Sequence, residues 1–168
     1  MKTNVSPEHP ARARTALASA ALIRLVTEID DNGPIPPHGL ACTLPDLTPH
    51  QVRHATEQAR LLGLVRTQPG RGLCLTEPGL QLAEIYDSAA RWARTHNHPR
   101  RTCDFITRVQ DTLRLLASGQ NSEAEPPVAP TQADESLTRL RTASAHWIST
   151  HWTDDEPVGA PQSLLEKA

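Results

Sequence analysis

The chain has 168 residues and is poor in aromatic side chains, cysteine and lysine. Its aromatic residues are 3 Trp, 1 Tyr and 1 Phe, so a hydrophobic core has to be built mainly from Leu, Val, Ile and Ala. Three cysteines cannot all pair with one another, and none stands in a Cys-x-x-Cys motif. This cysteine usage is typical of a reduced, intracellular protein. Only Lys2 and Lys167 are lysines, so nearly all of the positive charge is arginine.

Several kinds of functional segment are missing. The sequence contains no signal peptide and no apolar run of membrane length, so we expect a cytoplasmic protein without a membrane partner. It also lacks a Gly-rich phosphate loop, a nucleophile elbow, a His-Glu-x-x-His motif and paired carboxylates, which argues against an enzyme with catalytic residues or a cofactor. His96, His98, His146 and His151 lack the spacing and the further ligands of a metal site, so none is expected.

Charge is nearly balanced over the whole chain, with 17 Lys+Arg against 19 Asp+Glu and a net charge of −2. Its distribution is uneven. Residues 1–101 hold 12 basic and 9 acidic side chains, a balance of +3, whereas residues 102–168 hold 5 and 10, a balance of −5. A positive excess confined to one part of a chain points to that part as the candidate contact for an acidic partner such as nucleic acid.

Residues 48–62 carry the strongest helix signals in the positive part. Thr48 is a favoured N-cap residue, Pro49 suits the first helical position, and Gln51 completes a capping box. Leu47 and Val52 can form a hydrophobic staple, and Gly63 supplies a left-handed stop. Helical spacing predicts a buried face, formed by Val52, Ala55, Thr56, Ala59 and Leu62.

The segments on both sides of this helix predict a helix-turn-helix followed by a wing. A first helix is expected over 15–30 and a short second helix over 37–44. The buried stripe of the first helix is formed by Leu17, Ala21, Leu22, Leu25 and Ile29. In the second helix, Leu40 and Leu44 are expected to point inward. Strands are expected at 64–67 and 73–76, joined by a Pro/Gly hairpin at 68–72, and a long helix is expected over 76–97.

The rest of the chain predicts a mobile arm, two further helices, a linker and a tail. Residues 1–13 read as a flexible arm and residues 153–168 as a disordered tail. A helix over 102–118 carries an apolar seam of Ile106, Val109, Leu113 and Leu116. After a linker at 119–133, a last helix at 134–151 repeats that spacing with Leu137, Leu140, Ser144 and Trp147. We therefore expect region 98–152 to extend the domain and to take part in dimerisation.

A Trp-x-x-Thr-His pattern occurs twice. Trp92 to His96 and Trp147 to His151 both match it, each at the end of an expected helix. A degenerate duplication of a dimerising helix would produce this echo. Chance similarity in a chain rich in Ala, Arg and Thr would produce it as well, and both explanations stay open.

The order and spacing of four stretches resemble a known family. These are Leu44-Pro45-Asp46-Leu47-Thr48-Pro49, Gly63-Leu64-Val65-Arg66, Leu75-Thr76-Glu77-Pro78-Gly79, and Trp92 with His96. Residues 15–97 resemble a winged helix-turn-helix transcriptional regulator, most closely the HxlR type, with MarR-like and PadR-like regulators as relatives. The resemblance implies a mainly α fold with a small β-hairpin wing and C-terminal helices. Members of the HxlR family often carry a reactive cysteine in or before the first helix and a longer wing loop, and this chain has neither, so redox or aldehyde sensing is not implied.

The candidate DNA-contacting residues lie on the predicted recognition helix and the wing. In the major groove Gln can contact adenine and Arg can contact guanine, each through two hydrogen bonds, and His can contact a base or a phosphate. Wing arginines suit phosphate or the minor groove. The set is His50, Gln51, Arg53 and His54 on the helix, with Arg66 and Arg71 on the wing. Cys42 and Cys74 are expected at inward or half-buried positions, as small core residues.

We therefore expect a sequence-specific DNA-binding transcriptional regulator that acts on double-stranded DNA as a homodimer. Helices 76–97 and 102–118 would pair the subunits. The alternative is a winged-helix protein-interaction module without sequence-specific DNA binding. A positive surface over helix 48–60 and the wing favours DNA, and an acidic patch covering that helix favours a protein partner. The sequence identifies no effector and no operator.

Overall fold

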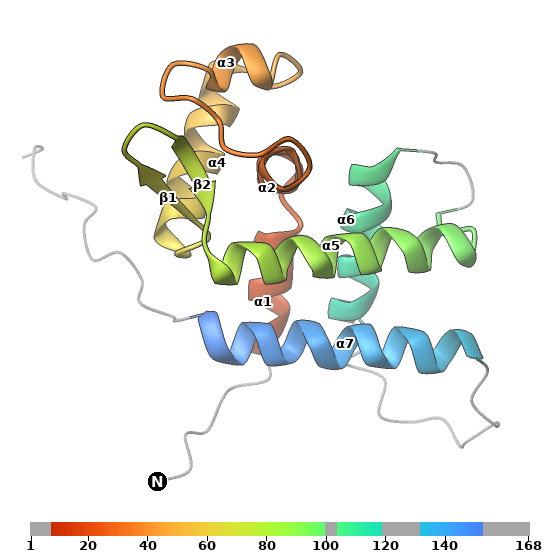
Figure 1. The fold of residues 1–168 in the computed structure, drawn as a ribbon. Helices are drawn as coiled ribbons and strands as arrows, with labels where there is room; N and C mark the ends of the chain where they lie inside the picture. The colour runs from red at the N-terminus through yellow and green to blue at the C-terminus, as the bar shows by residue number, and fades with distance from the viewer. Residues whose placement is uncertain (1–7, 100–103, 119–131, 153–168) are drawn as a thin grey trace, which may run out of the picture.

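The computed structural model describes residues 8–99, 104–118 and 132–152, which form seven helices and one β-hairpin (Figure 1). The elements are α1 (Glu8–Leu17), α2 (Ala20–Asn32), α3 (Leu40–Thr43), α4 (Pro49–Leu61), β1 (Val65–Gln68), β2 (Gly72–Leu75), α5 (Glu77–Thr95), α6 (Phe105–Ser118) and α7 (Gln132–His151). The prediction of a mainly α fold with a small β-hairpin is confirmed. The expected tail at 153–168, most of the linker at 119–133 and Cys103 lie outside the described residues.

The first predicted helix, 15–30, is in fact two helices. The chain breaks at Ala18 and Ser19, so that α1 and α2 point in different directions (Figure 1). Three side chains from other helices donate to carbonyls at the end of α1 and in the break after it. Gln58 Nε2 lies 3.1 Å from Ala16 O, Tyr86 Oη 2.7 Å from Leu17 O, and Gln110 Nε2 2.8 Å from Ala18 O. These donors satisfy carbonyls that have no partner within the helix.

The arm expected over residues 1–13 is shorter than predicted, because α1 already begins at Glu8. Ala13 and Arg14 are fully buried against the rest of the protein. Residues 1–7 lie outside the described part. The prediction was wrong for 8–13 because two prolines and scattered charges hide a helix whose burial depends on partners more than 100 residues away, such as Ser144.

The segments predicted to form a helix-turn-helix and a wing lie together at one end of the molecule (Figure 1). α2, α3 and α4 are followed by the antiparallel pair β1–β2, in the register Val65↔Leu75 to Gln68↔Gly72. Ile35, in the segment between α2 and α3, forms an isolated antiparallel bridge with Leu73 of β2. α3 is only four residues long, shorter than the expected helix 37–44, and Leu44 just after it is fully buried.

The end of α4 is fastened to the start of α5. Gly63 adopts φ +66°, and the amides of Gly63 and Leu64 donate to Arg60 O and Ala59 O, which ends α4 in a Schellman motif. The Thr76 hydroxyl then accepts from Gly79 N as the N-cap of α5 and donates to Gly63 O. A Cβ at residue 79 would collide with the Leu64 carbonyl, so glycine allows this close approach.

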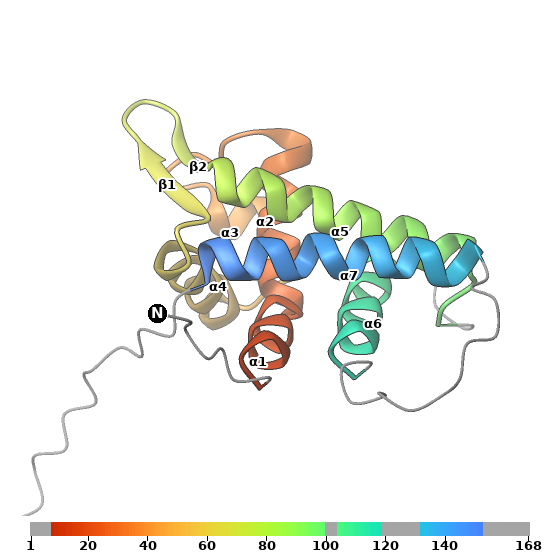
Figure 2. The same ribbon diagram turned by 90° about the horizontal axis from the view of Figure 1, so that it is seen from below.

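α5, α6 and α7 share a single core with α1, α2, α4 and the β-hairpin. α7 runs alongside α5 over much of its length, and α6 packs between α1 and α5 (Figures 1 and 2). The seam residues Val109, Leu113 and Leu116 are buried inside the same chain, as are Leu140 and Trp147 of α7. The core therefore does not divide near residue 97, and the apolar seams that predicted a subunit interface already have partners within one chain. α7 also begins at Gln132, two residues before the expected start.

Candidate nucleic-acid interface

The start of α4 has the predicted capping box. Thr48 Oγ1 accepts from Gln51 N at 3.3 Å, and Gln51 Oε1 accepts from Thr48 N at 2.9 Å. The same oxygen also accepts from the Thr48 hydroxyl at 2.9 Å. A bidentate contact with adenine needs both the oxygen and the nitrogen of a glutamine amide. Gln51, although exposed, is therefore committed to the cap and cannot read adenine in this way while the cap is closed.

His50, Arg53 and His54 are brought together on the exposed side of α4. The two imidazoles lie one turn apart with ring centroids at 6.4 Å and nearly parallel planes. The opposite side of the helix is buried through Val52, Ala55, Thr56 and Ala59, as the helical spacing predicts. The polar face is thus presented outward by a helix whose rotation is fixed by its apolar side.

An ion-pair network holds the turn that leads into α4. Arg24 of α2 donates from Nε to Asp46 Oδ2 at 3.2 Å and forms a second ion pair with Glu28. Leu44 anchors the same turn in the core. The direction of α4 is consequently set by α2, on which it packs. Asp46 is therefore engaged in this support and does not lie free in front of the polar face.

The two wing arginines lie away from the polar face of α4. Neighbouring residues of a strand point to opposite faces. Thr67 faces α4 and receives a hydrogen bond of 3.4 Å from Arg60, so Arg66 faces the other way. Arg66 and Arg71 are both exposed and line one hollow of about 300 Å³ with Asp30 and Leu80. The predicted set therefore separates into a helix group and a wing group.

Two further residues belong to the exposed side of α4. Arg60 was not among the predicted site residues, although its position two turns after Arg53 places it on the same side of the helix. Arg53 and Arg60 line one hollow beside α3. Glu57 stands between them in sequence and is also exposed. At the end of this side Leu61 is 78% exposed, which makes it the most exposed large apolar residue of the described chain.

Acidic side chains gather elsewhere. Burial and the neighbouring Asp31, Asp87 and Glu84 raise the pKa of Asp30. These four carboxylates lie at the end of α2 and along α5, and Asp30 lines the same hollow as Arg66 and Arg71. The exposed side of α4 itself carries only Glu57 as an acid. No acidic patch made of described residues covers α4.

Cysteine and histidine chemistry has little support in the described part of the chain. Cys74 is buried, as expected, but Cys42 is exposed because the short helix α3 turns it outward, which corrects the predicted inward position. Both are free thiols. Within the described residues no three His, Cys, Asp or Glu side chains are placed to hold a metal ion.

No match was found. Neither a family model, nor a curated protein, nor a solved structure matches this chain. The resemblance to winged helix-turn-helix regulators thus depends on the residues and their arrangement alone. Among the described helices, none is both long and apolar enough to cross a membrane.

Proposed function

We propose that the protein is a sequence-specific DNA-binding transcriptional regulator of the winged helix-turn-helix class. One observation carries the proposal: α4 starts at a capping box, follows a short turn after α3, and presents Arg53, His50 and His54 outward beside a β-hairpin. A capped helix of this kind can enter the major groove with its N-terminal turns closest to the base edges.

In this proposal Arg53 reads a base and Arg60 contacts the phosphate backbone. His50 and His54 supply further hydrogen bonds at the start of the helix, and Gln51 keeps the cap in place. Arg71, in the exposed turn of the hairpin, reaches the neighbouring backbone or the minor groove. Arg66 contributes to the positive charge near the wing, without a base contact.

The homodimer remains part of the proposal, but its interface is no longer α5 with α6. Those helices pack on each other and on α1 in one chain. The number of chains on a site can be read from the salt dependence of binding. Arg53, Arg60 and Arg71 give three fixed cations per chain, so log K should fall by about 3 per decade of salt for one chain and by about 5 for two.

The experiment is a selection from a randomised duplex library, together with a gel shift against the DNA upstream of the protein's own gene. Enriched duplexes are then titrated by fluorescence anisotropy at several salt concentrations, with a scrambled duplex as control. We expect enrichment of one motif and the salt dependence given above. Failure to enrich any motif, or affinity that does not change with salt, would refute the proposal.

A protein-interaction module is the second candidate. Leu61 favours it, because an apolar side chain that is 78% exposed at the end of α4 can be buried against the apolar surface of a protein partner. Glu57 on the same side would repel phosphate. In this case a Leu61→Ala change should weaken capture of a protein partner and leave duplex binding unaltered.

A further inference from the structure

The exposed side of α4 borders an apolar hollow with a charged rim. This hollow, of about 300 Å³, lies between α3 and α4. Its apolar residues are Leu40, Ala41, Pro49 and Val52, and its charged residues are Arg53, Glu57 and Arg60. Arg53 forms no hydrogen bond or ion pair within the part of the chain that the structure describes. An apolar hollow beside an unpaired guanidinium favours a segment that carries both acidic and large apolar side chains.

The chain that follows Trp152 has this composition. Residues 153–168 lie outside the described residues, and their sequence holds four acidic side chains against one lysine, a balance of −3. Three of the acids are consecutive, at positions 154–156, and two leucines follow at 164–165. None of the DNA contacts proposed above uses this negative charge.

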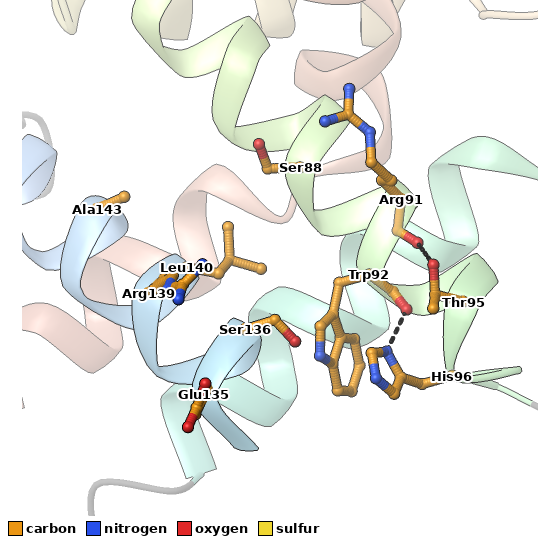
Figure 3. Close-up of a pocket in the computed structure, with 10 residues that line it drawn as sticks. All are labelled: Ser88, Arg91, Trp92, Thr95, His96, Glu135, Ser136, Arg139, Leu140 and Ala143. Carbon is orange, nitrogen blue, oxygen red and sulfur yellow. Dashed lines mark hydrogen bonds between the residues drawn. The ribbon is translucent and has the colours of Figure 1, made fainter. Parts of the chain in front are cut away.

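The direction of α7 decides where this segment begins. Residues 135–143 in the first half of α7 lie opposite the last turns of α5, so the two helices run antiparallel (Figure 3). The end of α7 accordingly lies at the start of α5. There Trp147 Nε1 donates to Pro78 O at 3.0 Å, and His151 Nε2 lies 3.1 Å from Gln81 Oε1.

The start of α5 is in turn fastened to the end of α4. The Thr76 hydroxyl donates to Gly63 O, and Thr76 N donates to Leu64 O at 2.9 Å. Trp152 is half-buried and packs against the core. Figures 1 and 2 both show the last turn of α7 beside the corner at which α4 is followed by the hairpin and α5. The chain therefore leaves the described part of the molecule near Arg60.

The lengths allow this segment to follow α4. An extended chain covers at most about 3.5 Å per residue, so Glu156 can lie up to about 14 Å from Trp152, and Leu165 up to about 45 Å. Arg53 lies about 10 Å beyond Arg60 along the helix. The acids thus reach the arginines first, and the leucines reach the hollow beyond them. A tethered segment has an effective concentration in the millimolar range, so a few weak contacts suffice.

We propose that residues 153–168 dock on the exposed side of α4 of the same chain. The carboxylates at 154–156 pair with Arg60 and Arg53, and Leu164 and Leu165 enter the hollow between α3 and α4. The docked segment covers the residues proposed to contact DNA, and a duplex has to displace it. This last consequence depends on the proposed function, whereas the docking itself does not.

Amide hydrogen exchange of the full chain, measured by mass spectrometry without DNA, tests the docking. The double variant Leu164→Ser and Leu165→Ser leaves the net charge unchanged. We expect peptides from α4 to exchange at least about threefold faster in this variant, with peptides from α6 unaltered. Unchanged exchange in α4 would overturn the proposal. An exchange difference that depends on protein concentration would assign the docked segment to a second copy, and would overturn docking within one chain.

A charge-matched pair of variants tests the acidic contacts. Each variant replaces three carboxylates by amides. The tail variant is Asp154→Asn, Asp155→Asn and Glu156→Gln, and the control is Asp31→Asn, Glu84→Gln and Asp87→Asn. The control residues are exposed on α2 and α5, away from the α3–α4 hollow. The tail variant should speed exchange in α4 and the control should not, and equal exchange in the two would contradict the pairing with Arg53 and Arg60.

Duplex binding by the leucine variant tests the consequence for DNA. Fluorescence anisotropy on a selected duplex should show at least about threefold tighter binding than wild type, which a change in net charge cannot explain. Equal duplex affinity beside faster exchange in α4 would overturn the covering of the DNA-contacting face. Faster exchange in α4 without duplex binding by either protein would refute the DNA-binding function and support the docking.

Discussion

Individual arginines in this molecule occupy three different environments. Arg14 is fully buried between α1 and α7, Arg24 is half-buried in an ion-pair network, and Arg53 is exposed on α4. Burial and the neighbouring charge of Arg141 lower the pKa of Arg14. Its Nε donates to Ser144 Oγ at 3.3 Å, but Nη1 and Nη2 find no acceptor in the described chain. Buried charge without a carboxylate partner is costly.

Replacing Arg14 by methionine should therefore not destabilise the protein. Arg14→Met keeps much of the side-chain volume and removes the buried charge, so we expect the free energy of unfolding to rise by about 1–3 kcal/mol. Ser144 keeps its own hydrogen bond to Arg141 O. Urea unfolding measures the change, and Arg12→Met, at an exposed position of the same helix, should have no effect. A loss of more than about 1 kcal/mol in Arg14→Met would mean that Arg14 has an anionic partner.

Arg53 and Arg71 should differ in what they contribute to DNA binding. Arg53→Ala should cost about 1–3 kcal/mol on a selected site and relax the preference at one base pair. Arg71→Ala should weaken all duplexes by a similar factor, because a phosphate contact carries little base identity. Titration of both variants on selected and scrambled duplexes tests this, with thermal melts to check folding and Arg94→Ala as the control. Equal losses on both duplexes for Arg53→Ala would remove it from the base-reading residues.

At the scale of secondary-structure elements, the β-hairpin lies in close backbone contact with the segment between α2 and α3. In the hairpin Gly72 has φ +96°, and a Cβ there would collide with the carbonyl of Ile35. Gly70, two residues earlier, has φ +76° but open space around it. These two glycines separate the cost of a left-handed backbone from the cost of a collision.

Alanine substitution at the two positions should give different results. Gly70→Ala should destabilise the protein by about 1 kcal/mol, the cost of a left-handed conformation for a residue with a Cβ. Gly72→Ala should cost about 2 kcal/mol or more, because the Ile35 bridge must also move. Chemical unfolding of both variants is the measurement. An equal loss of unfolding free energy in the two variants would show that the Ile35 segment can move without an energetic penalty.

At the scale of the whole molecule, residues 8–99 and the C-terminal helices α6 and α7 share one core. Helix α6 covers α1 and α5, and α7 covers α5 and α1. The buried residues contributed by α6 and α7 include Val109, Leu113, Leu116, Trp147 and Ile148. The region after residue 98 is thus part of the same folding unit.

A fragment ending at Pro99 should fail to fold cooperatively. Burying one large apolar side chain contributes about 1.5–3 kcal/mol, so losing these partners removes on the order of 10 kcal/mol, as much as a typical domain's whole stability. We expect a broad thermal transition and binding of a hydrophobic dye, against one sharp transition for the full chain. A sharp transition in the fragment near the full-chain temperature would show that residues 8–99 fold alone.

Sequence signals predicted those helices, strands and site residues whose positions are determined by residues close in the chain. Thr48, Gln51 and Gly63 marked both ends of α4, and Val52, Ala55 and Ala59 its buried face, since caps and helical periodicity act within a few residues. From the sequence, Gln51 had two possible roles, as part of the capping box and as a contact for adenine. The hydrogen bond from Thr48 N to Gln51 Oε1 decided that the side chain caps α4. The separation of Arg66 from α4 depends on strand register and could not be read from arginine positions.

The sequence alone determined the helical class, the hairpin, the capped helix α4 and the placement of positive charge, because each follows from contacts between residues close in the chain. Only the tertiary structure decided the break between α1 and α2, where Gln58, Tyr86 and Gln110 reach the carbonyls of Ala16, Leu17 and Ala18 from three other helices. It also decided that α6 and α7 bury their apolar seams against α5 and α1 of the same chain. Apolar periodicity says that a face will be buried and does not say which surface will bury it.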